Sequence, residues 1–123
     1  MPELEDTHHQ ILMEYNKVLD VLSEGFGYLA ENISQEAPPE AQRIFLDILH
    51  AFERLSKSHE YLTDLFGGGN LLDDFREIIL LLSEWFHRPT NSEKRELLVK
   101  SVIPCYENWK NRVQQIVRPY IIH

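Results

Sequence analysis

Carboxylates and histidines recur in this sequence at a spacing that metal sites use. The pairs in which a carboxylate precedes a histidine by three residues are Glu5 with His8, Asp47 with His50, and Glu84 with His87. On a helix this spacing puts both side chains on one face, and di-iron helical bundles use Glu-x-x-His pairs in this way. A shared site needs its ligands at one level of the core, whereas the predicted helices place His8 and His87 at opposite ends. We therefore expect neither a metal nor another cofactor.

A second pattern joins a phosphate-binding group to a proton-transfer group. Arg54, His59 and Tyr61 follow one another as Arg-x4-His-x-Tyr. A guanidinium suits a phosphate, and a histidine can move protons near neutral pH. The pattern resembles the signature of HEPN-type ribonucleases, small helical-bundle proteins that act as dimers. The resemblance implies RNA cleavage across a dimer interface, with Arg54 and His59 contributing to phosphate binding and proton transfer and Tyr61 nearby.

A structural interpretation of His59 competes with this one. The apolar stripe of the predicted helix passes through His59 and turns Arg54 towards solvent. A histidine on such a face is more often a neutral core residue with one satisfied nitrogen than a metal ligand. His8 also lies on an apolar stripe near the same end, so the two histidines could approach each other. We expect His59 to be a core residue, and the ribonuclease is the alternative.

The composition indicates one soluble domain. Of 123 residues, 43% are apolar and 26% are charged, enough for a single core, and we treat residues 1–123 as one helical-bundle domain. No apolar run approaches the ~20 residues of a membrane span, and the acidic start is the reverse of a signal peptide. Cys105 is the only cysteine, which suits a reducing compartment. We expect an acidic cytoplasmic protein without membrane contact.

The charge is strongly negative and unevenly spread. A formal charge of −8 disfavours nucleic acid, since binding to phosphate backbones depends on clustered positive charge. Residues 91–123 nevertheless hold 6 of the 12 basic side chains and 3 of the 20 acidic ones. We expect a basic last helix to lie between acidic neighbours, and an acidic partner of that helix is the alternative.

Four stretches repeat apolar residues in steps of four and three, the spacing that keeps side chains on one helical face. They predict helices over residues 2–34, 38–66, 71–88 and 91–119. The third stretch is apolar nearly all round, which predicts a short helix that is buried on every side. Pro104 removes one backbone hydrogen bond from the fourth helix, so we expect a kink near Lys100.

The connections carry residues that end one helix and begin another. Asn70 follows three glycines and is placed to cap the third helix with its side chain. Thr90 and Glu93 form a Thr-x-x-Glu capping box for the fourth helix. Pro119 is expected to end that helix. Short connections of this kind favour an up-down-up-down four-helix bundle.

The unequal helix lengths predict uncovered apolar surface. At 1.5 Å per residue the third helix reaches only ~27 Å, while its neighbours reach ~40 Å or more. Exposed apolar strips usually mark interaction sites. The residues that we expect at such an interface come from the ends of the longer helices and from the apolar third helix, and they are Phe26, Leu29, Ile33, Ile44, Phe45, Leu80, Leu81, Val113, Ile116, Val117, Tyr120 and Ile121.

These observations favour a protein that binds other proteins over an enzyme. The leading hypothesis is a non-enzymatic, chaperone-like or regulatory bundle that forms a homodimer or binds the amphipathic helix of a partner. The alternative is a HEPN-like homodimeric ribonuclease that uses Arg54, His59 and Tyr61.

Overall fold

The computed structural model describes residues 6–33, 39–61 and 70–121, with the side chains of residues 6–8, 39 and 61 left out of the description. All the regular elements in these residues are helical and none is a strand, which confirms the prediction of an all-α protein. In chain order they are α1 (Asp6–Asn32), α2 (Pro39–Tyr61), α4 (Leu71–Ser83), the 3-10 turn η1 (Glu84–His87), α5 (Asn91–Leu97), the π-helical turn η2 (Leu98–Val102) and α6 (Ile103–Ile121). None of the helices in the described part of the chain has the length and apolar character needed to cross a membrane.

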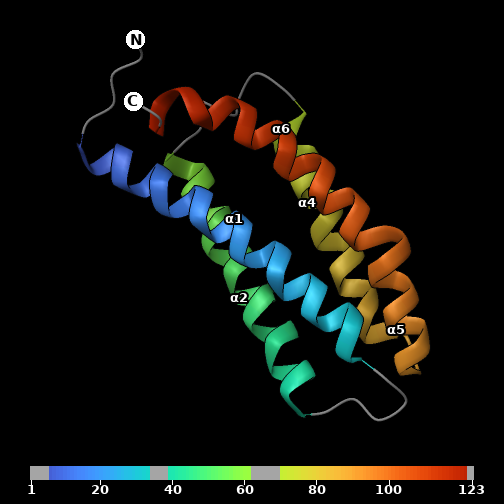
Figure 1. Cartoon of the computed structure of the whole chain (residues 1–123). Coiled ribbons are helices and arrows are strands. Elements are labelled where there is room, and N and C mark those ends of the chain that lie inside the picture. Colours follow the sequence, from blue (N-terminus) through green and yellow to red (C-terminus); the bar gives the residue numbers. More distant parts are fainter. Residues whose placement is uncertain (1–5, 34–38, 62–69, 122–123) are drawn as a thin grey trace.

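The helices lie lengthwise against one another. α1 packs along α2 on one side and along α6 on the other, and α4 packs along α6. In Figure 1 the colours show that α1 and α2 run in opposite directions, as do α4 and α6. α5, η2 and α6 follow without a gap, so residues 91–121 form one long helical segment.

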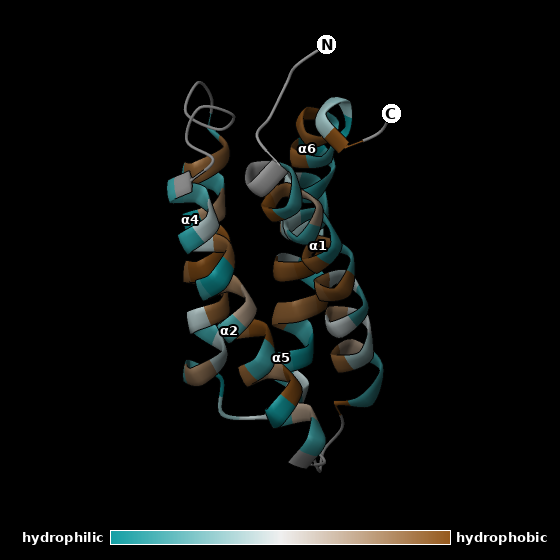
Figure 2. Ribbon diagram, turned by 90° about the vertical axis from the view of Figure 1, so that its left-hand side faces the viewer, coloured by the Kyte–Doolittle hydropathy of each residue, from teal (hydrophilic) through white to brown (hydrophobic). Residues whose placement is uncertain are grey.

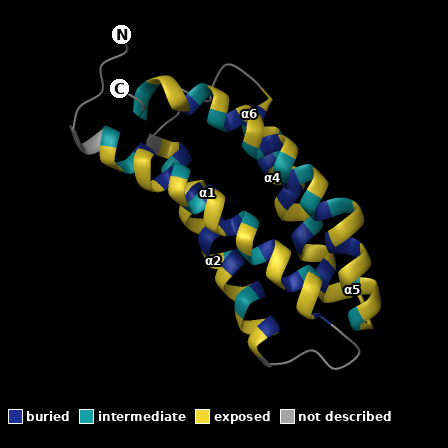
Figure 3. Cartoon of the chain, viewed as in Figure 1, coloured by how far each residue is buried: buried dark blue, intermediate teal, exposed yellow. Residues whose placement is uncertain are grey.

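Apolar stripes on the four long segments meet in a single core. Buried positions face inward and exposed positions face outward along each ribbon (Figure 3), and each ribbon carries both hydrophobic and hydrophilic segments (Figure 2). The largest fully buried side chains are Trp109, Tyr106, Phe26 and Phe45. The rings of Phe26, Tyr106 and Trp109 form a connected cluster in which Phe26 lies 5.1 Å from Tyr106 and Tyr106 lies 6.0 Å from Trp109. The Phe45 ring stacks separately on Trp85. Burial of these large rings is the main apolar contribution to the stability of the fold.

The basic α6 lies between acidic neighbours, as the charge distribution predicts. Lys110 pairs with Asp20 of α1 at 3.0 Å, and Arg112 pairs with Asp74 of α4 at 2.6 Å. α6 is therefore fixed on both sides by ion pairs in addition to its buried apolar face.

The ends of the helices agree with the sequence in one place and differ in two. The Thr90 hydroxyl accepts a hydrogen bond from the Glu93 amide at 3.1 Å, which confirms the Thr90 half of the predicted capping box. The side chain of Asn70 makes no capping hydrogen bond, so the prediction of a side-chain cap is wrong. The backbone carbonyl of Asn70 instead accepts a hydrogen bond from the backbone amide of Asp74. Pro119 lies inside the last turn of α6 and does not end it.

The backbone next to Pro104 departs from the α-helix. The π-helical turn η2 occupies residues Leu98–Val102 and contains Lys100, which precedes Pro104 by four residues. A π turn widens the helix by one residue, which is one way to accommodate a proline that cannot donate a hydrogen bond.

The third predicted helix corresponds to α4 and η1, and it is not buried on every side. Leu71, Phe75, Ile78 and Leu82 are buried. Ile79 and Leu80 are exposed, because α4 has neighbours on its core face only and leaves the opposite face to solvent. The prediction of full burial is wrong for this reason, and an apolar surface remains.

Candidate functional site

His59 is a core residue. It is 6% exposed, and its Nε2 lies 2.6 Å from the hydroxyl oxygen of Tyr15. Its ring packs edge-on against Phe75 at 4.6 Å and lies 6.2 Å from Trp109. Burial lowers the pKa of His59 to about 4, so the imidazole is neutral near pH 7 and is poorly suited to shuttle protons there.

The pH dependence of stability tests this placement. The pKa of His59 is about 4 in the folded chain against 6.5 for an ordinary histidine, so the unfolded chain takes up the proton first as the pH falls. The free energy of unfolding should therefore drop by roughly 2–3 kcal/mol between about pH 6.5 and pH 4, since one pKa unit corresponds to ~1.4 kcal/mol. Chemical denaturation of His59→Gln should show a flatter profile over this range, whereas His50→Gln, exposed on the same helix, should keep the wild-type profile. Equal slopes in all three proteins would contradict a buried neutral His59.

The structure does not bring Arg54 and His59 to one site. His59 borders a hollow between α2 and α4, whereas Arg54 is exposed and borders a groove on the other side of α2, towards α1. The Tyr61 side chain and the His8 side chain lie outside the described residues, so the predicted approach of His8 to His59 does too. Arg54 thus contributes its charge to a different surface from the one that His59 reaches.

The two carboxylate and histidine pairs that the structure describes do not converge either, and the pair of Glu5 with His8 lies outside the described residues. Asp47 and His50 on α2 are exposed, and so are Glu84 and His87 on η1. The described part of the chain contains no cluster of three or more His, Cys, Asp or Glu side chains that could hold a metal ion.

Most of the predicted interface residues are covered by the chain itself. The side chains that are buried in the core are Phe26, Leu29, Ile33, Phe45, Val113 and Val117. The side chains that are half-buried against it are Ile44, Leu81, Ile116, Tyr120 and Ile121. Leu80 alone among the twelve is largely exposed, at 61%. The expectation of uncovered strips at the helix ends is therefore wrong for the six buried residues.

The reason lies in the 3-10 turn and in α5. η1 continues α4 far enough for Trp85 to stack on Phe45 at 4.1 Å. The Arg95 side chain of α5 then donates a hydrogen bond to the Ala30 carbonyl at 2.9 Å. These contacts cover the end of the α1–α2 pair that we expected the short third helix to leave open.

Exposed apolar side chains instead follow the line between α2 and α4. Leu46 on α2 is 49% exposed, Ile79 on α4 is 38% exposed and Phe86 on η1 is 63% exposed. Together with the half-buried Leu49 and Leu72 they form what we call the α2–α4 face. Leu80 lies one residue beyond Ile79, about 100° farther round the helix, and borders this face.

Shallow hollows run along the α2–α4 face. Their volumes are about 250, 270 and 260 Å³, in order from η1 towards Asn70. Leu46 and Phe86 line the first, and Ile79 lines both of the others. Two of the hollows share Ser56 and Ile79, and the third lies nearer to η1 on the same face, so the α2–α4 face is uneven and can fit closely against another uneven surface.

The two edges of this face carry opposite charges. Glu53 and Glu60 line the hollows from α2, whereas Arg76 lines them from α4 and Lys94 from α5. Lys94 also lies over the Trp85 ring, 5.4 Å from its centre. A partner surface would match these charges if it placed basic side chains opposite the α2 edge and acidic side chains opposite the α4 edge.

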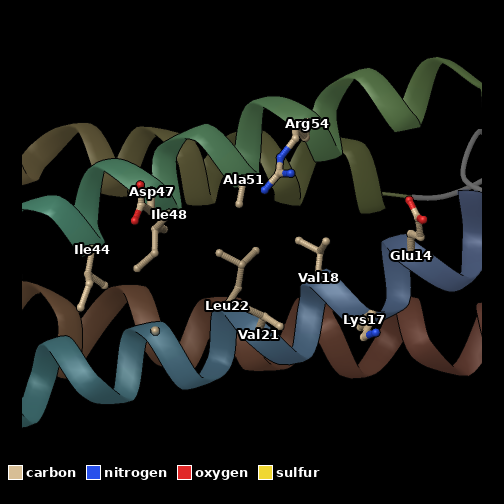
Figure 4. Close-up of a pocket in the computed structure, with 11 residues that line it drawn as sticks. Glu14, Lys17, Val18, Val21, Leu22, Ile44, Asp47, Ile48, Ala51 and Arg54 are labelled. Carbon is tan, nitrogen blue, oxygen red and sulfur yellow. The ribbon is translucent and has the colours of Figure 1, made fainter.

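A groove of larger volume lies between α1 and α2. It has a volume of about 510 Å³ and an apolar floor, shown in Figure 4. Its charged borders are Glu14 and Lys17 from α1 and Asp47 and Arg54 from α2. At Gly25 an added Cβ would meet Ile48 Cδ1 at 3.4 Å, so the glycine keeps this end of the groove open.

A polar network between α1 and α6 is absent from the sequence predictions. Ser23 donates to Glu107 at 2.7 Å and accepts from Lys110 at 2.9 Å. Lys110 is also held by Asp20, so the ammonium is neutralised by carboxylates and is a poor general base for Ser23. Desolvation opposes ionisation of Asp20, but hydrogen bonds from Lys110 and Gln114 lower its pKa. The network fixes α6 on α1 and does not form a nucleophile–base pair.

Comparison with known proteins adds a family and nothing more specific. A family model matches residues 10–112, which include nearly all of α1 and both surfaces described above. The search of curated proteins and the search of solved structures found no match.

Proposed function

Because the chain belongs to the family described as "Domain of unknown function (DUF8042)", whose description states no activity, we propose a function from the geometry. The chain is a non-enzymatic interaction protein whose α2–α4 face packs against a second copy of the same chain. The observation that carries the proposal is the alignment of Leu46, Ile79 and Phe86, all exposed, along one line of hollows.

The charged edges favour a second copy as the occupant of this face. Two-fold dimers bring the same patch of both subunits together, so the patch must complement itself. With the two-fold axis along the bundle, α2 of one copy lies opposite α4 of the other. Glu60 and Arg76 line the same hollow, so this axis places the carboxylate of one copy at the level of the guanidinium of the other. Opposite charges then meet at both edges.

The apolar residues complement one another under the same axis. Leu46 and Phe86 line one hollow, so Leu46 of one copy faces Phe86 of the other. Each contact of this kind would bury a side chain that is about half exposed, or more, in the single chain. A large apolar side chain contributes up to ~1.5–3 kcal/mol when it is fully buried. The two-fold axis doubles every contact.

Sedimentation velocity of the wild-type chain tests the proposal. We expect a reversible dimer at micromolar concentration, because the apolar face is narrow and its edges are charged. A chain that stays monomeric up to ~100 μM would overturn the proposal. A dissociation constant above that concentration corresponds to less than ~5.5 kcal/mol of binding free energy.

Finer features of the fold belong to the same proposal. We propose an up-down-up-down order of the four long segments, with a change of helix direction at Pro104, supported by the helix directions in Figure 1 and by the π turn. We also propose a cytoplasmic location. The ribonuclease alternative is not retained, because Arg54 and His59 lie on opposite sides of α2.

A further inference from the structure

The α1–α2 groove lies on the other side of α2 from the α2–α4 face and needs an occupant of its own. Its volume of about 510 Å³ falls within the ~300–1,000 Å³ range of small-molecule sites. Val18, Leu22, Ile48 and Ala51 contribute to an apolar floor. Val21 on its edge is 58% exposed, so the groove is open to solvent there.

The groove is long and narrow. It extends from Glu14 to Gly25 along α1 and from Ile44 to Arg54 along α2, which is ~15 Å at 1.5 Å per residue. The small residues Ala51 and Gly25 leave space at its floor. A ligand that fills it must be extended and apolar over most of its length.

The charges make the two ends different. Figure 4 shows the Arg54 guanidinium directed into the gap between the helices, at the same end as Lys17. Within the part of the chain that the structure describes, neither Arg54 nor Lys17 takes part in an ion pair. Glu14 borders this end, which still keeps a net positive charge. Asp47 lies at the far end beside Ile44 and repels an anion there.

We propose that the α1–α2 groove binds one free aliphatic carboxylate of medium chain length. The carboxylate lies at Arg54 and Lys17, and the chain runs over Val18, Leu22 and Ile48 towards Gly25. A guanidinium binds a carboxylate through paired hydrogen bonds, and an apolar chain of this length covers the floor. Asp47 fixes the orientation by excluding the anionic head from the other end.

Isothermal titration of the full chain with dodecanoate, below its micelle concentration, tests the proposal. We expect one site per chain. Binding should weaken by about fourfold for each methylene removed, because each buried methylene contributes ~0.8 kcal/mol. Titrations with decanoate and octanoate measure this dependence on chain length. Dodecyltrimethylammonium should bind at least tenfold more weakly, because it places a cation beside Arg54.

Matched variants connect the binding to the groove. Arg54→Gln should weaken dodecanoate binding at least tenfold, whereas Arg43→Gln, an exposed arginine of the same helix outside the groove, should not. Val21→Glu should abolish binding, and Met13→Glu, exposed on the same helix but outside the groove, should retain it. All four positions are exposed, so circular dichroism should show intact folds. Leu46→Glu on the α2–α4 face should leave the affinity unchanged, which separates this proposal from the dimer.

Other outcomes would overturn the proposal. Equal affinity for the cationic detergent, several ligands per chain, or an unchanged affinity in Arg54→Gln would each exclude a carboxylate site. Vesicles of phosphatidylglycerol that bind Arg54-dependently while free dodecanoate does not would assign the groove to a membrane lipid. A synthetic amphipathic helix that binds the groove without any binding of dodecanoate would assign it to a protein.

Discussion

Leu46→Glu is expected to convert the dimer into a monomer, with a dissociation constant at least ~100-fold higher than that of the wild type. The substitution removes apolar contact and brings a carboxylate into a desolvated interface, and the two-fold axis applies both costs twice. A change of ~2.7 kcal/mol is enough for this factor. Sedimentation equilibrium at several concentrations measures it.

Met13→Glu is the matched control for this change. Met13 and Leu46 are both 49% exposed, both lie within long helices, and both become glutamate, but Met13 lies on α1, away from the α2–α4 face. The control should keep the wild-type dissociation constant, and both variants should unfold within ~0.5 kcal/mol of the wild type. Equal weakening by both substitutions would show a nonspecific effect of charge and would contradict the proposed interface.

Trp109→Ala is expected to give the largest loss of stability, ~3–5 kcal/mol. Trp109 is 1% exposed and packs against Phe75 at 5.2 Å, and its Nε1 donates a hydrogen bond to the Leu71 carbonyl at 2.9 Å. The residue therefore links α6 to the first turn of α4 by both packing and hydrogen bonding. At about 4 °C per kcal/mol for a chain of this size, the melting temperature should fall by ~12–20 °C.

Two further variants divide this effect into its parts. Trp109→Phe keeps much of the ring but leaves the Leu71 carbonyl without its donor, so it should cost ~1–3 kcal/mol. Val99→Ala, at a position 42% exposed on the same helical segment, should change the melting temperature by no more than ~3 °C. A Trp109→Ala protein that melts within 4 °C of the wild type would contradict the placement of Trp109 at the centre of the core.

Helices and core were predictable from periodicity, because the spacing of apolar residues depends only on local geometry. The stripe on residues 41–66 correctly places His59 inside and Arg54 outside. In α1 the apolar spacing fits a line through Ile11 and Val18 as well as one through Leu12 and Leu19, and the structure buries Leu12 and Leu19 fully. Which of these two adjacent lines is buried depends on how α1 is rotated against its neighbours, and the local sequence does not determine that rotation.

The surfaces were less predictable because they depend on how far each element reaches. The 3-10 turn that carries Trp85 onto Phe45 closes the helix end that seemed uncovered. The apolar excess of residues 71–88 was a valid signal, but periodicity could not tell that Ile79 and Leu80 would face solvent while Ile78 was buried. The small residues Gly25 and Ala51 were the available signal for the α1–α2 groove, and their meaning required the pairing of α1 with α2.

Chemical cross-linking of two variants tests the proposed dimer most directly. Leu46→Cys and Phe86→Cys, each made with Cys105→Ser, are mixed and treated with a short bismaleimide. The two-fold axis along the bundle predicts that the mixture forms a cross-linked dimer of the two variants, detected by mass. A mixture of Met13→Cys with Phe86→Cys serves as the reference and should stay uncross-linked. If Leu46→Cys and Phe86→Cys cross-link no more than this reference, the α2–α4 face does not pair with a second copy in the proposed way.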